Sequence, residues 1–244
     1  MDSDPPEIPV QPIPFSYGLT NFAQSLVRGK AKIVAIGSST TAGEGGIKAY
    51  PERLLSLLQI DYSNARITVV NEGIGGTEAP SELQRFDADV IAAKPDLVIW
   101  QVGTNAVWQS LSERPPPPSF EATTTAIRDG LDKLRKETQA DVILMDLQYV
   151  PAVLTPAKKH KAIAMVEAIT ELAREAGVNV FRRFAFMEGL HKVERVSFDR
   201  LVDPNDDNRL HDSDWATGRV TWALKLAIVD GVKKVWSSPA VIGS

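Results

Sequence analysis

Short apolar runs alternate with amphipathic helical patterns along most of this chain. The run at residues 96–102 shows no polar alternation before Gln101, as expected of a strand that is covered on both faces. Strands that alternate with helices predict a parallel sheet, and right-handed crossovers then give a three-layer α/β/α domain. The expected strands are 32–36, 67–71, 96–102, 141–147 and 178–181. The expected helices are 50–62, 81–93, 120–138, 156–176 and 213–235.

Composition limits the classes of protein that this chain can belong to. Its 244 residues suffice for one domain with a full core. A net charge of −4 argues against nucleic-acid binding, which needs a basic face. The absence of cysteine excludes disulfides, thiolate metal ligands and a cysteine nucleophile. No apolar run approaches the roughly 18 residues that span a bilayer, so we expect no membrane span.

The first sixteen residues are rich in proline and acidic, and we interpret them as an extended arm. The expected organisation is an arm and lead-in over 1–29, a folded domain over 30–236 and a tail over 237–244. The N-terminus has neither the basic nor the apolar region of a signal peptide. The compartment stays open between the cytoplasm and the periplasm or exterior after signal removal, and the oligomeric state is unknown.

Small and polar residues follow three of the expected strands. The first strand ends in Gly37-Ser38-Ser39, the second in NEGIGG at 71–76, and the third in VGTN at 102–105. Taken singly, these are ordinary helix caps and turns. Because the carboxyl ends of parallel strands share one edge of the sheet, the three segments should meet there. A hydroxyl with backbone and amide donors suits acyl transfer through an oxyanion, whereas phosphate-loop, dinucleotide-binding and G-x-S-x-G motifs are absent.

A serine nucleophile needs a base, and the chain has three histidines. His160 lies in AKKHKA on an expected helix, where solvent exposure is the usual outcome. His191 follows Glu188 by three residues and is a competitor. His211 precedes the final helix, in a loop that can bring its imidazole over the carboxyl edge of the sheet, so we rank it first.

These residues together resemble the SGNH (GDSL-like) hydrolases, whose signature lies in four short blocks. IGSSTTAG, VVNEGIGG, VGTNA and NRLHDSDW resemble these blocks in the right order, within about residues 30–235. The resemblance implies a nucleophile at Ser39, a backbone oxyanion donor at Gly76, a side-chain oxyanion donor at Asn105 and a base at His211. It also implies a flavodoxin-like α/β/α sandwich over 30–236 that cleaves esters without a metal or organic cofactor.

Two positions depart from the family pattern. Ser38 stands where the first block usually has Asp, a change that we expect to be tolerated. Asn208 stands where the last block usually has the Asp that orients the base, so its spacing predicts a place beside the imidazole. An amide carries no charge to stabilise the imidazolium, and the equivalent change costs about 10⁴ in kcat in a serine protease.

Three explanations for Asn208 stay open. Asp207, or with lower priority Asp206 or Asp203, reaches the imidazole through a shifted loop. Alternatively, the carbonyl oxygen of Asn208 accepts a hydrogen bond from the ring and leaves a weakened triad or a Ser-His dyad. The third is that the chain carries a substitution at this position.

The expected function is hydrolysis of a small-molecule or carbohydrate ester, with a short acyl or acetyl group, through an acyl-enzyme on Ser39. One alternative is an O-acyltransferase on the same fold. The other is a carbohydrate- or lipid-binding module with weakened catalysis, for which Asn208 is the main support. Trp108, residues 115–118 and Phe120 either form an apolar wall beside the site or a rigid surface loop.

Overall fold

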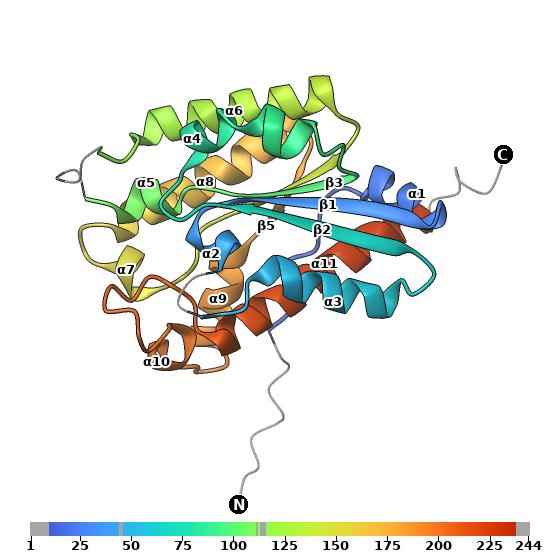
Figure 1. Ribbon diagram of the computed structural model, residues 1–244. Coiled ribbons are helices and arrows are strands. Elements are labelled where there is room, and N and C mark those ends of the chain that lie inside the picture. Colours follow the sequence, from blue (N-terminus) through green and yellow to red (C-terminus); the bar gives the residue numbers. More distant parts are fainter. Residues whose placement is uncertain (1–9, 44–45, 111, 113–115, 238–244) are drawn as a thin grey trace, which may run out of the picture.

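The computed structural model describes residues 10–43, 46–110, 112 and 116–237 (Figure 1). In this part of the chain, five strands form one sheet in the order β2-β1-β3-β4-β5, and each neighbouring pair is parallel. The expected parallel sheet is therefore confirmed. The strands are β1 Lys30–Gly37, β2 Arg66–Gly73, β3 Leu97–Gln101, β4 Asp141–Met145 and β5 Asn179–Phe181.

The strand order reverses at β1, which pairs with β2 on one side and β3 on the other. All five residues of β3 are buried, and Val34 of β1 lies beside its Val98 in the register. Such a reversal opens a crevice at the carboxyl ends of the central strands, because the connections from them run to opposite faces. In Figure 1 these ends lie on the left, where α2, α5, α7 and α10 surround them.

Helices cover both faces of the sheet and complete the three layers (Figure 1). Helices α4, α6 and α8 cover one face, and α3, α9 and α11 cover the other, with α1 packed against α11. The long helices are α1 Thr20–Val27, α3 Tyr50–Asp61, α6 Phe120–Glu137, α8 Lys159–Ala176, α9 Arg183–Lys192 and α11 Asp214–Trp236. The short ones are α2 Ser39–Ala42, α4 Ala79–Leu83, α5 Thr104–Trp108, α7 Pro151–Leu154 and α10 Phe198–Leu201.

The structure differs from the expected helices in a few places. The helix expected over 81–93 is α4 followed by a π-helical turn, Asp87–Ile91. The α4 segment begins earlier because Pro80 is in its first turn and Glu78 caps it. The sequence did not predict six further helices: α1, α2, α5, α7, α9 and α10.

The lead-in to β1 belongs partly to the core. The side chains of Phe15, Leu19 and Phe22 are buried, and the Leu19 N–H donates to the carbonyl of Gly231 in α11 at 3.1 Å. The packed body therefore begins ahead of residue 30. Most of the expected arm (1–9) and of the tail (238–244) lies outside the described residues. None of the helices that the structure describes is long and apolar enough to cross a membrane.

Candidate active site

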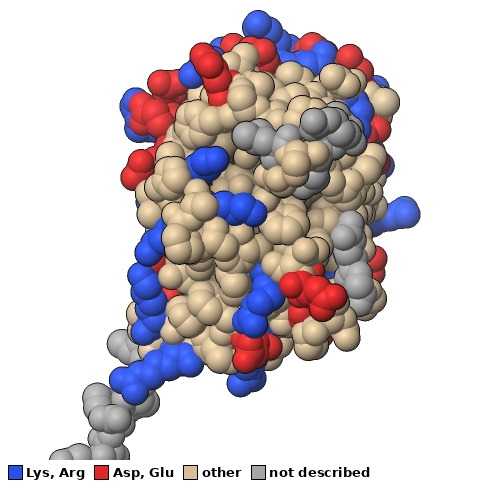
Figure 2. All heavy atoms as spheres, turned by 90° about the vertical axis from the view of Figure 1, so that its left-hand side faces the viewer, with Lys and Arg blue, Asp and Glu red and all other residues tan. Residues whose placement is uncertain are grey.

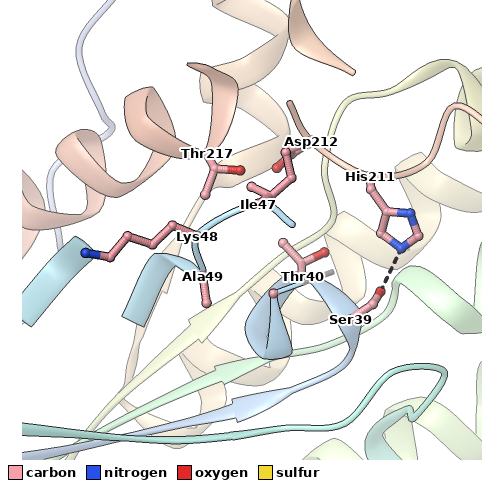
Figure 3. Close-up of a pocket in the computed structure, with 9 residues that line it drawn as sticks. Ser39, Thr40, Ile47, Lys48, Ala49, His211, Asp212 and Thr217 are labelled. Carbon is pink, nitrogen blue, oxygen red and sulfur yellow. Dashed lines mark hydrogen bonds between the residues drawn. The ribbon is translucent and has the colours of Figure 1, made fainter. Parts of the chain in front are cut away.

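Ser39 stands where the buried strand β1 ends and α2 begins. Its side chain is only 7% exposed, and its Oγ lies 3.0 Å from Nε2 of His211 (Figure 3). Gln101, the last residue of β3, holds this turn: its Oε1 accepts hydrogen bonds from the N–H and the hydroxyl of Ser38, both at 3.0 Å. The strand end thus presents the Ser39 hydroxyl toward the imidazole while the neighbouring serine is tied inward.

Glycine 73 lets β2 approach this turn closely. A Cβ at that position would lie 2.1 Å from the backbone nitrogen of Ala42 in α2, which is too short for any side chain. The first turn of α2 therefore rests directly on the end of β2. This contact brings the segment that follows β2 beside the Ser39 turn.

His211 lies in the loop between α10 and α11. The loop is closed by an antiparallel bridge between Val202 and Asp212, and the Asp203 N–H donates to the His211 carbonyl at 2.9 Å. Nδ1 of His211 lies 2.9 Å from Oδ2 of Asp206. The carboxylate of Asp206 accepts a hydrogen bond from Nδ1–H, and this tautomer of the ring directs the lone pair of Nε2 at Ser39.

Asp206 is fixed by the backbone of its own loop. It accepts backbone N–H bonds from Asn208 at 3.0 Å, Leu210 at 2.8 Å and His211 at 2.7 Å. Desolvation works to raise the pKa of Asp206, but these bonds and the neighbouring imidazole together lower it from its ordinary value. The carboxyl beside His211 is therefore ionised across the neutral pH range.

The position predicted for Asn208 is thus taken by Asp206. The hydrogen bond of Asn208 at this site comes from its backbone N–H, which donates to Oδ1 of Asp206. Arg209 adopts φ 56°, a left-handed conformation that turns the chain between Asn208 and His211. The family pattern places the acid three residues before the histidine. Here the loop folds back on itself, so that Asp206, five residues before His211, reaches the imidazole. Of the alternatives, the shifted loop is the one observed, with Asp206 rather than Asp207.

The two expected oxyanion donors lie on segments that are bonded to each other. Nδ2 of Asn105, a buried side chain of α5, donates to the carbonyl of Thr77 at 2.7 Å. Thr77 follows Gly76, and its hydroxyl lies 3.3 Å from the carbonyl of Gly37, just before the Ser39 turn. Gly76 has φ 77°, a left-handed conformation that glycine adopts without strain. The three strand ends therefore converge as expected.

A buried polar network links helix α9 to the His211 loop. Arg183 of α9 is fully buried, and its Nη2 donates to Oε1 of Gln148 at 2.7 Å. Nε2 of Gln148 donates in turn to the carbonyl of Leu210 at 3.2 Å. Neither residue was predicted. The available signal was Gln148, a polar residue shortly after the apolar run of β4.

A cavity of about 20 Å³ opens beside Ser39 and His211. In Figure 3, Asp212 and Thr217 close one side of it, and Lys48 extends away from the reactive pair. Figure 2 views the molecule from this end, where uncharged residues occupy most of the centre and many charged side chains lie nearer the margins. The cavity is lined by Ser39, Thr40, Gly43, Ile47, Lys48, Ala49, His211, Asp212 and Thr217.

The other two histidines lie outside this arrangement. His160 is exposed on α8. Nδ1 of His191 is 2.8 Å from the carbonyl of Val196, and its ring stacks on Phe198 with the centroids 4.0 Å apart. The structure therefore joins Ser39 to His211 and not to the competitor.

The apolar wall that was considered beside the site is described only in part. Trp108 ends α5, and the ammonium group of Lys158 lies 4.6 Å from its ring centroid. Phe120, the first residue of α6, is 48% exposed. Pro115 lies outside the described residues, so the wall stays a prediction.

The sequence matches a known family and is similar to a known esterase. Residues 5–234 match the family described as "Non-GDSL lipase-like family", a lipase-like family whose name is not the GDSL-like one expected. An acetylxylan esterase from Geobacillus stearothermophilus is 38% identical over 89 residues, 32% of this chain and 41% of that protein. The chain is thus matched to less than half the length of this relative.

Solved structures share the fold. Axe2, an acetylxylan esterase from Geobacillus stearothermophilus, has a TM-score of 0.64 at 22% identity, over 86% of this chain and 97% of that chain. LAE5, described as an alpha/beta hydrolase enzyme from the metagenome of Lake Arreo, has a TM-score of 0.67 at 18% identity, over 84% and 96%. At these identities the likeness shows the three-layer fold.

Proposed function

Because the chain belongs to the non-GDSL lipase-like family, we propose that it is a serine esterase that hydrolyses short-chain carboxylic esters, acetylated carbohydrates among them. The observation that carries the proposal is the continuous chain of hydrogen bonds from Asp206 through His211 to Ser39, at 2.9 and 3.0 Å. A carboxylate, an imidazole and a hydroxyl in this order form a charge-stabilised base and its nucleophile.

The reaction runs through an acyl-enzyme. Nε2 of His211 takes the Ser39 proton as Oγ attacks the ester carbonyl, and Asp206 stabilises the imidazolium that forms. The imidazolium then returns its proton to the departing alcohol, which leaves Ser39 acylated. A water molecule, deprotonated by His211, then attacks the acyl carbon, and the imidazolium returns that proton to Oγ of Ser39 as the acid leaves.

The oxyanion of each tetrahedral intermediate binds the backbone N–H groups of Ser39 and Gly76 and the amide of Asn105, in the manner of the SGNH hydrolases. Nδ2 of Asn105 carries two hydrogens, and Thr77 accepts one of them. The second is available to the oxyanion. Donors held in place before the reaction cost no reorganisation when charge develops.

The space beside the nucleophile is small, which favours a short acyl group over a long one. The cavity of about 20 Å³ is near the minimum that holds one water molecule, and Ile47, Ala49 and Thr217 bound it. The partial match to an acetylxylan esterase supports an acetyl group. Structures of Axe2, an acetylxylan esterase from the same organism, include catalytic mutants in which a serine, an aspartate and a histidine are each replaced by alanine.

The contact between Asp206 and His211 favours hydrolysis over a binding module. The support for the binding module was Asn208, which would leave the base without a charged partner. A carboxylate with a lowered pKa supplies that partner. The observation that favoured a binding module with weakened catalysis therefore no longer supports it.

The test compares Ser39→Ala with the wild type on p-nitrophenyl esters of increasing acyl length and on acetylated xylan. We expect the wild type to prefer acetyl esters and to be labelled by a fluorophosphonate, and Ser39→Ala to lose both turnover and label. Ser56→Ala, an exposed serine of α3, is the matched control and should behave as the wild type. Turnover retained by Ser39→Ala, or an unlabelled and inactive wild type, would contradict the proposal.

A further inference from the structure

Two buried carboxyl groups lie behind the oxyanion donors and take no part in the steps above. Glu78 caps the N-terminus of α4, and Glu82 follows one turn later in the same helix. Glu78 is 4% exposed and Glu82 is fully buried. Burying a carboxyl is costly unless its surroundings satisfy it, so their partners indicate what they do.

The carboxyl of Glu78 is surrounded by backbone donors. Oε1 accepts from Gly103 at 2.7 Å and Ala79 at 3.0 Å, and Oε2 accepts from Asn105 at 2.9 Å and Ala106 at 3.1 Å. A proton on either oxygen would displace one of these N–H groups. Burial raises the pKa of Glu78, and the four N–H bonds oppose that rise. Because all four of these partners are donors, the geometry is that of an ionised acceptor.

These bonds join the two segments that carry the oxyanion donors. Gly103, Asn105 and Ala106 form the first turn of α5, which holds the Asn105 side chain. Glu78 itself follows Thr77, whose carbonyl accepts from Nδ2 of Asn105. Asn105 is thus fixed by its backbone through Glu78 and by its side chain through Thr77.

The surroundings of Thr77 indicate the state of Glu82. The Thr77 hydroxyl lies 2.8 Å from the carbonyl of Ile74, 3.3 Å from that of Gly37 and 3.0 Å from Oε1 of Glu82. The hydroxyl has one hydrogen, and carbonyl oxygens cannot donate. When Thr77 donates to a backbone carbonyl, Glu82 completes the arrangement by donating its own proton to the Thr77 oxygen.

The environment of Glu82 agrees with a protonated carboxyl. Burial, and then the charge of the neighbouring Glu78, raises the pKa of Glu82 to about 8, while the hydrogen-bond contacts with Trp100 and Thr77 and the charge of Arg85 work in the opposite direction. The second oxygen accepts from Nε1 of Trp100 in β3 at 2.7 Å. The titratable and charged groups that face Glu82 are Glu78, Arg85 and, from α3, Tyr50.

We propose that Glu78 and Glu82 are positioning residues for the oxyanion site, with Glu78 as the ionised clamp on α5 and Glu82 as the protonated donor that holds the Gly76-Thr77 turn. This inference rests on the proposed esterase function. Loss of the Glu82 proton sets a second charge beside Glu78 and leaves the Thr77 hydroxyl among three acceptors. The turn that presents Gly76 then loosens, and kcat falls as the pH rises through about 8.

The experiment measures kcat and KM for p-nitrophenyl acetate from pH 6 to 9.5 in the wild type, Glu78→Gln and Glu82→Gln. Glu78→Gln turns an amide group toward backbone donors, so kcat should fall about 10- to 100-fold with KM within about twofold. Glu82→Gln donates to Thr77 and accepts from Trp100 without titrating, so the alkaline fall in kcat should disappear. Glu121→Gln, an exposed glutamate of α6, is the matched control with the wild-type profile.

The outcomes separate this inference from the proposed function. An inactive wild type counts against the esterase. An active wild type with an unchanged kcat in Glu78→Gln overturns the clamp, and an unchanged alkaline fall in Glu82→Gln overturns the donor. If Glu78→Gln fails to fold by circular dichroism, the near-isosteric Glu82→Gln still decides whether these carboxyls position the turn.

Discussion

Two carboxyl groups support different segments of the Ser39 site, the His211 loop and the turn that carries Gly76, and their surroundings favour opposite charge states. Asp206, on the loop side, lies near solvent, receives three backbone N–H groups and has a lowered pKa. Glu82, on the helix side, is fully buried next to another carboxyl and has a pKa raised to about 8. The number of donors and the degree of burial thus decide whether a carboxyl beside the site acts as an anion or as a proton donor.

The comparison also separates two kinds of support. Asp206 contacts His211 directly, so its charge acts on the reacting groups. Glu82 acts at a distance, through Thr77 and the turn that carries Gly76. Removing the first should abolish most of the catalysis, and changing the second should alter mainly its pH dependence.

The largest effect is expected from Asp206→Asn. Without the carboxylate, no negative charge stabilises the imidazolium, and the imidazole is no longer held in the reactive tautomer. The value of kcat should therefore fall by about 10⁴. Asn208→Ala, which keeps the backbone N–H that donates to Asp206, should leave kcat within about twofold. Steady-state kinetics on p-nitrophenyl acetate measures both variants. A larger loss of kcat in Asn208→Ala than in Asp206→Asn would indicate that Asn208, and not Asp206, orients His211.

A smaller loss is expected from Asn105→Ala. One oxyanion donor is removed while the Ser39-His211 pair is retained, so kcat should fall by about 10²- to 10³-fold. Asn64→Ala, an exposed asparagine, is the control. An Asn105→Ala variant with wild-type kcat would remove this side chain from the oxyanion site.

The smallest effect is a change in stability with pH. Glu82 has an ordinary pKa of 4.5 when unfolded and about 8 when folded, so between these values the folded state holds the extra proton. Its contribution to the free energy of unfolding is therefore complete below about pH 4.5 and is lost as the pH rises through about 8. Between pH 6 and pH 9, the free energy of unfolding of Glu82→Gln should fall by roughly 3 kcal/mol less than that of the wild type, as measured by denaturant unfolding. Equal losses in the two proteins would indicate that Glu82 is ionised throughout.

Prediction from the sequence succeeded where the signal is local. The first three strand ends could be recognised because an apolar run stops there at small or polar residues. The alternation of strands and helices then predicted that these ends share one edge of the sheet. Helix α1 and the buried segment before it were missed, because Phe15, Leu19 and Phe22 look like an ordinary lead-in until the remote helix α11 packs against them. Glu78 and Glu82 were missed because nothing in EAPSEL distinguishes a buried carboxyl from an exposed one.

The parallel α/β/α architecture, and the meeting of the strand ends that lead to Ser39, Gly76 and Asn105, could be predicted from the sequence alone. Both follow from hydrophobic periodicity and from the alternation of strands and helices along the chain, which short stretches of sequence reveal. The sequence also ranked His211 above its competitors. The contact of Asp206 rather than Asn208 with the imidazole, and the burial of Glu82 beside Glu78, could be seen only in the folded chain. Those outcomes depend on how the loop closes between Val202 and Asp212 and on which side of α4 meets β3, and such contacts are made by residues remote in the chain.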